Sequence, residues 1–141
     1  MKASPFKTVG LLALIQFSNT LDFMMVMPLG PDFVLALQID PSRLPWISGS
    51  YTIAGGLIGI LGSFFLDRFE RKKALIVSLL GLALATIWGG FAGSLGELLA
   101  SRVLAGLFGG PATALAFAIV TDVTPVEMRG RAMGILISSF S

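Results

Sequence analysis

The chain has 141 residues, of which 55% are hydrophobic and 13% are charged, and its net charge is +2. A soluble domain of ordinary composition carries about 25% charged residues, so this composition excludes a typical soluble globular domain. The chain has no Cys and no His, which excludes disulfides, Cys/His catalysis and most zinc or haem sites. We therefore expect no metal and no cofactor.

Apolar blocks long enough to cross a bilayer divide the chain. A spanning helix needs about 20 residues, and a window of about that length identifies four spans and the start of a fifth. The four blocks cover residues 9–37, 46–66, 74–92 and 98–121. Residues 132–141 are the start of the fifth. The sequence therefore predicts an all-α membrane protein with the lipid bilayer as its first partner.

Basic residues gather on one side of the predicted spans, which sets the expected orientation. If successive spans alternate in direction, that side holds Lys2, Lys7, Arg68, Arg71, Lys72, Lys73, Arg129 and Arg131. The opposite side holds Arg43 alone. The positive-inside rule places the basic side in the cytoplasm, so we expect a multi-pass protein of the cell membrane, of the bacterial inner-membrane type, with a cytoplasmic N-terminus. Basic residues beside spans set topology, and no nucleic-acid partner is expected.

Asp22 lies deep in the first predicted span, between Met and Leu residues. A carboxylate at that depth costs several kcal/mol unless it is paired, protonated or facing a wet cavity. Ser18 and Asn19 share its helix face and Gln16 lies nearby, which predicts a polar stripe facing the bundle interior. Two interpretations remain open. Asp22 is either a structural acid bonded to a neighbouring helix or an acid that takes up protons or faces a substrate.

Arg102, in the fourth predicted span, is the matching charge. Counting 1.5 Å per residue in a core of ~30 Å places Asp22 and Arg102 at the same depth, each about 8 Å below the outer boundary. Opposite charges at one depth in one bundle are expected to pair, directly or through water. Proton uptake by Asp22 would then release Arg102 for an anionic group. Tyr51, about two turns into the second span, is expected either to line a cavity or to pack.

Glycines at four-residue intervals occur in the second and fourth predicted spans. Gly55 and Gly59 form one GxxxG pair, and Gly106 and Gly110 form another. Small residues at positions i and i+4 let helices approach closely, so all four are expected to pack helices together.

Prolines predict bends in two spans. Pro28 and Pro31 bracket a glycine near the outer end of the first span, and Pro111 follows two glycines in the fourth. Proline removes a backbone donor and is an identifiable cause of helix kinks. We therefore expect a kink at each place.

The charged segment between the second and third spans resembles a known family signature. Residues 62–75 read GSFFLDRFERKKAL, similar to the G-x-L-a-D-R-x-G-R-K signature of the major facilitator superfamily. The residues that match at the proper spacing are Asp67, Arg68, Arg71 and Lys72. Ser63 and Glu70 stand where the signature has glycine. The resemblance implies a gate in which Asp67 holds a helix of the other half, whereas on physical grounds alone the segment is a basic loop that sets topology.

Three further segments resemble the same superfamily. RVLAGLFGG, from Arg102, is similar to its R-x-x-x-G motif, which implies a proton-coupling role for this arginine. TDVTPVEMRGRAMG, at 121–134, resembles its loop between spans four and five. LDFMMVMPLGP, at 21–31, resembles the drug/proton antiporter and sugar-efflux branches, which implies that Asp22 is the membrane-embedded acid.

The resemblance implies part of the N-terminal six-helix bundle of a major-facilitator fold, whose halves are inverted 3+3 repeats. The implied function is that of the N-terminal portion of a proton-coupled secondary transporter, an exporter of small apolar or drug-like compounds. Asp22 and Arg102 would couple protons, and Gln16, Asn19 and Tyr51 would line the cavity. The implied partners are a small-molecule substrate and the remaining transmembrane helices or a partner chain.

Two alternatives to this function remain open. A sugar or metabolite porter is the nearer one. The other is a short non-transporting membrane protein, or a half-transporter, that assembles with a partner. The sequence contains no recognisable nucleophile–base pair, metal cluster or phosphate-binding loop, so an enzyme is not expected.

Overall fold

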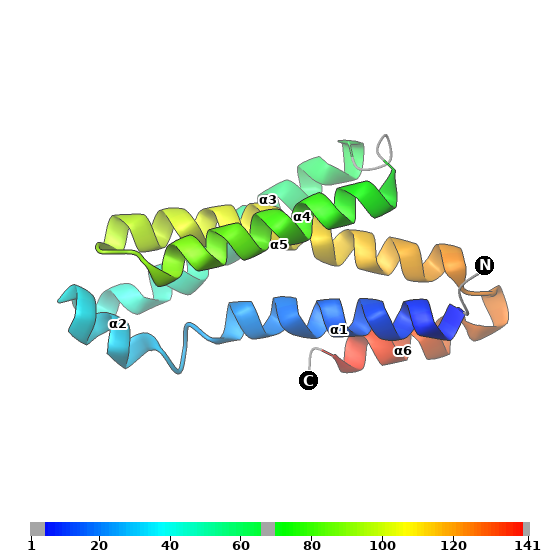
Figure 1. Ribbon diagram of the computed structural model, residues 1–141, viewed down its shortest axis with the longest axis horizontal. Coiled ribbons are helices and arrows are strands. Elements are labelled where there is room, and N and C mark those ends of the chain that lie inside the picture. The colour runs from blue at the N-terminus through cyan, green and yellow to red at the C-terminus, as the bar shows by residue number, and fades with distance from the viewer. Residues whose placement is uncertain (1–4, 66–69, 140–141) are drawn as a thin grey trace.

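The computed structural model describes residues 5–65 and 70–139, and this part of the chain is helical, with no β-strand in it (Figure 1). Short 3-10 turns, Pro41–Arg43 and Val126–Met128, lead into the third and sixth helices. The helices are α1 (Pro5–Met24), α2 (Gly30–Leu37), α3 (Leu44–Phe65), α4 (Arg71–Gly90), α5 (Leu95–Val123) and α6 (Arg129–Ser138). The all-α prediction is confirmed.

Three segments within the described residues are long and apolar enough to cross a membrane. They are Pro41–Gly62, Arg71–Gly90 and Leu95–Val123, and they correspond to the second, third and fourth predicted spans. Their outer faces carry large apolar side chains; Leu84 of α4, for example, is 67% exposed. Such faces suit a lipid environment, in which every backbone polar group must be satisfied within the helix.

The first predicted span, 9–37, does not form one helix. α1 ends at Met24, α2 begins at Gly30, and turns join them. The sequence predicted a kink here, whereas the structure has a full interruption. Pro28 has no N–H to continue the hydrogen-bond ladder, and Pro31 suits the first turn of a new helix. By contrast, α5 continues as a helix through Pro111.

α5 is the central helix of the bundle. It packs against both α3 and α4, and α1 and α6 lie side by side and also contact it (Figure 1). One apolar cluster joins α1, α5 and α6 near the start of α1, and includes Val9, Leu115 and Leu136. A second joins Val26 and Leu98 near the other end of the bundle. The polar residues of α1 lie between these clusters, so the fold holds them inside the bundle.

Candidate functional site: a buried acid and arginine shared by three helices

The ion pair expected from the depth of Asp22 and Arg102 is present. Arg102 Nη1 lies 3.5 Å from Asp22 Oδ2, and the two side chains are only 3% and 9% exposed. The same nitrogen lies 3.5 Å from the main-chain oxygen of Asp22. Because the last turn of α1 faces the second turn of α5, the two charges meet inside the bundle, away from the lipid-facing surface.

Thr86 of α4 is the third member of the site. Its hydroxyl donates a hydrogen bond of 2.6 Å to Asp22 Oδ1, so the carboxylate joins α1, α4 and α5. Sequence reasoning missed this residue. The available signal was weak, since Thr86 is one of two hydroxyl residues in an otherwise apolar block, the other being Ser78.

The ion pair is held loosely for a buried one. At 3.5 Å its atoms stand beyond the usual range of an N–H···O hydrogen bond. Asp22 Oδ2 and Arg102 Nε are both buried without a hydrogen-bond partner among the described residues. Buried ion pairs compensate for their desolvation only when geometry and further hydrogen bonds are good. Two polar atoms of the site are therefore free to bond to another polar group.

The three residues predicted to line a cavity lie together. Gln16 and Asn19 are one to two turns before Asp22 on α1, and Tyr51 is on α3. The Tyr51 hydroxyl donates to Asn19 Oδ1 at 2.9 Å. Asn19 Nδ2 donates to Thr113 Oγ1 at 2.8 Å and to the Gly109 main-chain oxygen at 3.2 Å. Gln16 Nε2 lies 3.4 Å from the same Thr113 oxygen. This network joins α1, α3 and α5. No sequence feature indicated that Thr113 belonged to it.

A cavity of about 390 Å³ opens beside this network, with Gln16, Asn19 and Tyr51 in its lining. Phe23 and Tyr51 also line it, and their ring centroids lie 5.3 Å apart. Asp22 does not line this cavity. It lines two others, of about 520 Å³ and 760 Å³, together with Thr86. Asn19 lines both the first cavity and the one of about 520 Å³, so it lies between the neutral polar network and the acid.

Three of the four glycines predicted to pack helices do so, at the crossing of α3 and α5. A Cβ atom added at Gly106 would lie 2.3 Å from the Tyr51 main-chain oxygen, and one added at Gly110 would lie 2.7 Å from the Gly55 main-chain oxygen. Gly59 differs, since an added Cβ there would meet no atom of the described chain within 4 Å. Gly59 therefore lies outside this contact.

The predicted gating segment is only partly described. Asp67 and Arg68 lie outside the described residues. Arg71 forms an ion pair with Asp122 and donates to the Ala118 main-chain oxygen at 3.2 Å, which ties the start of α4 to the end of α5.

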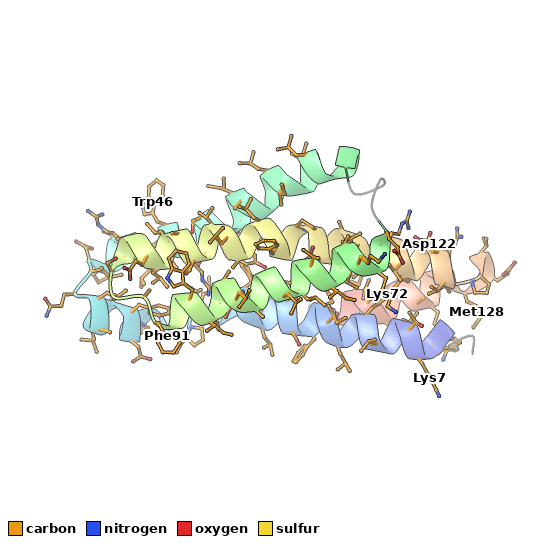
Figure 2. The ribbon with its side chains drawn as sticks, turned by 45° about the horizontal axis from the view of Figure 1, so that its top comes forward. Lys7, Trp46, Lys72, Phe91, Asp122 and Met128 are labelled. Atoms are coloured by element: carbon orange, nitrogen blue, oxygen red, sulfur yellow. The ribbon has the colours of Figure 1, made fainter. Side chains whose placement is uncertain are left out.

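Lys72 is exposed at the same end of the bundle. Figure 2 shows it together with Asp122, Lys7 and Met128 at this end, with Trp46 and Phe91 toward the other.

The sequence is similar to a family of known proteins. The family model described as Major Facilitator Superfamily matches residues 12–141. The chain is 35% identical over 97 residues to the puromycin resistance protein pur8 of Streptomyces alboniger, covering 68% of this chain and 19% of that protein. It is 29% identical over 140 residues to the multidrug transporter mfsB of Aspergillus fumigatus, covering 95% and 23%.

A third relative is named for the transport of one compound. The chain is 31% identical over 127 residues to the probable sulfoacetate transporter SauU of Cupriavidus necator, covering 90% of this chain and 30% of that protein. The chain thus spans less than a third of the length of each of these three relatives. No solved structure matches it significantly.

Proposed function

This chain belongs to the major facilitator superfamily of membrane transport proteins, and we propose that it forms the N-terminal part of a proton-coupled exporter of small, largely apolar compounds. In this proposal α1 and α2 together make the first of four transmembrane segments, and α6 begins a fifth. The N-terminus and the basic end of the bundle face the cytoplasm, following the positive-inside rule.

The observation that carries the proposal is the buried pair of Asp22 and Arg102, which joins two helices through a loose 3.5 Å contact. A proton on Asp22 removes the charge that compensates Arg102. An uncompensated buried charge is strongly unfavourable, so the helices that carry the pair must then rearrange or admit another anion. Proton uptake is thereby linked to helix position, which is the requirement for coupling protons to transport.

The proposed substrate class follows from the cavity beside the network. Its volume of about 390 Å³ is within the range of small-molecule sites, which are lined mostly by apolar and aromatic groups with a few polar ones. Rings from Phe23 and Tyr51, glycine backbone and the amides of Gln16 and Asn19 supply that mixture. The drug-related names of pur8 and mfsB agree with this class.

The cytoplasmic gate is the third part of the proposal. The Arg71–Asp122 pair fastens α4 to α5 at the basic end, which leaves Lys72 available for a contact with another part of the protein. Asp67 and Arg68 would complete this gate, as the family resemblance implies.

The proposal is tested with the protein expressed from its complete reading frame and reconstituted in liposomes. Puromycin is the first compound to assay, because a relative's name refers to it. We expect uptake that follows an imposed pH gradient and falls to the background rate when a proton ionophore collapses it. Equal uptake with and without the gradient would refute proton coupling. No uptake of puromycin or of a panel of small, largely apolar compounds would instead favour the non-transporting alternative.

A second candidate is a porter of small organic anions. Arg102 Nε is buried without a hydrogen-bond partner among the described residues, and a guanidinium suits carboxylate or sulfonate oxygens. The name of SauU refers to a sulfonated acid. Uptake of sulfoacetate but not of puromycin in the same liposomes would favour this candidate.

A further inference from the structure

The geometry points to Thr86 as a positioning residue that holds Asp22 in both of its protonation states, an inference that rests on the proposed function. Thr86 lies on α4, whereas the acid and its arginine lie on α1 and α5. Neither the sequence motifs nor the ion pair itself requires a hydroxyl at this position.

The distances show which contact fixes the carboxyl group. Thr86 Oγ1 lies 2.6 Å from Asp22 Oδ1, whereas Arg102 Nη1 lies 3.5 Å from Asp22 Oδ2. Hydrogen bonds between a hydroxyl and a carboxylate are short and about twice as strong as neutral ones. The hydroxyl therefore contributes the closest polar contact of this side chain, and it sets the rotation of the carboxyl group between α4 and α5.

Thr86 has a second acceptor for its single hydrogen. Its oxygen also lies 2.9 Å from the main-chain oxygen of Leu82, one turn earlier on α4. A hydroxyl has one hydrogen to donate and two lone pairs to accept with, so it serves only one of these acceptors at a time. Two arrangements of the Thr86 hydrogen are thus available without any movement of α4 relative to α1, whatever α5 does.

The two arrangements match the two states of the acid. When Asp22 is ionised, the Thr86 hydroxyl donates to Oδ1. When Asp22 is protonated on Oδ1, that O–H donates to Thr86 Oγ1, and the threonine hydrogen turns to the Leu82 oxygen. The proton stays on Asp22 throughout, and Thr86 neither gains nor loses one.

The surroundings of Asp22 contain few other groups that respond to pH. Arg102 faces it from α5. Tyr51 of α3 contacts Phe23 with its rings tilted and donates a hydrogen bond to Asn19, and both of these residues are close to Asp22 on α1. α4 contributes the Thr86 hydroxyl. Thr86 and Asp22 together line the cavities of about 520 Å³ and 760 Å³, so the hydroxyl and the acid share the same surroundings.

The test compares Thr86→Val, which keeps the shape and removes the hydroxyl, with Thr86→Ser, which keeps the hydroxyl. Gradient-driven uptake by the full protein in liposomes is measured over a series of pH values. Loss of a bond to the charged form costs more than loss of a bond to the neutral form, so the valine variant should have its pH midpoint moved upward by about half to one unit. The serine variant should keep the wild-type midpoint.

Unchanged pH dependence in Thr86→Val, or an equal shift in Thr86→Ser, would overturn the inference. If the valine variant does not fold, Thr86→Ala replaces it, and the same upward shift is expected. Asp22→Asn separates this inference from the proposed function. If Asp22→Asn leaves uptake and its pH dependence unchanged, the proposed function fails. If it abolishes gradient-driven uptake while Thr86→Val changes nothing, only the role of Thr86 fails.

Discussion

Replacing Asp22 by asparagine should abolish uptake driven by a pH gradient and leave the protein folded. Asparagine has the shape of aspartate and keeps an oxygen that accepts the Thr86 hydrogen bond, but it cannot take up a proton in the physiological range. The gradient-driven component of uptake should therefore fall to the rate seen without a gradient. Exchange of labelled for unlabelled substrate, which needs no net proton movement, should persist and would show that the variant is intact.

Asp32→Asn is the matched control for that experiment. Asp32 lies in the first turn of α2 and is exposed, so the same chemical change there removes a carboxylate that is not paired inside the bundle. We expect wild-type coupling in this variant. Equal loss of uptake in both variants would mean that overall charge, and not the buried acid, is responsible.

Replacing Gly106 by alanine should separate α3 from α5 and destabilise the bundle. The added Cβ would lie 2.3 Å from the Tyr51 main-chain oxygen and 3.1 Å from the Gly55 main-chain nitrogen. These are backbone atoms, which cannot move aside as a flexible side chain can, so the helices themselves must shift. Overpacking of this kind typically costs about 1–3 kcal/mol, occasionally more. The measurement is the unfolding temperature in detergent, which should fall clearly below that of the wild-type protein.

Gly59→Ala is the control for the glycine variant. It makes the same change on α3, yet the new Cβ would meet no described atom within 4 Å. In addition, alanine is more favourable than glycine inside a helix by about 1 kcal/mol. We expect an unfolding temperature equal to or above that of the wild-type protein. If Gly106→Ala is as stable as Gly59→Ala, the close approach of α3 and α5 at Gly106 is wrong.

The sequence predicted α3, α4 and α5 because each comes from a long, mostly apolar block. It did not predict the interruption between Met24 and Gly30. Residues 24–29 are all apolar except for the proline, and hydropathy averaged over a span cannot distinguish a bend from a break in the backbone. That distinction depends on which carbonyl groups lose their partners.

Part of the site was predictable because a charged side chain is unusual inside an apolar span. Asp22 and Arg102 are charges in an apolar setting, and counting residues along each helix placed them at the same depth. Thr86 is different, because a lone hydroxyl in a span can bond to its own backbone and carries no comparable signal. Its contact with Asp22 depends on how α4 packs beside α1.

The spacing of glycines and of charges along the chain also left the contacts between helices undetermined. A four-residue interval shows that Gly55 and Gly59 share a helix face, but the crossing point with α5 decides which of them is in contact. Likewise, the sequence placed Arg71 and Asp122 at one end of the bundle without pairing them, since the pairing depends on how the ends of α4 and α5 meet.

The most direct test of the central claim, that Asp22 is the proton-binding group linked to transport, is proton release by the purified full protein in weakly buffered detergent. Adding the substrate identified in the liposome assay should release protons from the wild-type protein, because substrate and proton then favour different arrangements of the helices around the pair. The Asp22→Asn protein should bind the substrate without releasing protons. Proton release of equal size from the Asp22→Asn protein would contradict the account and place the coupling group elsewhere.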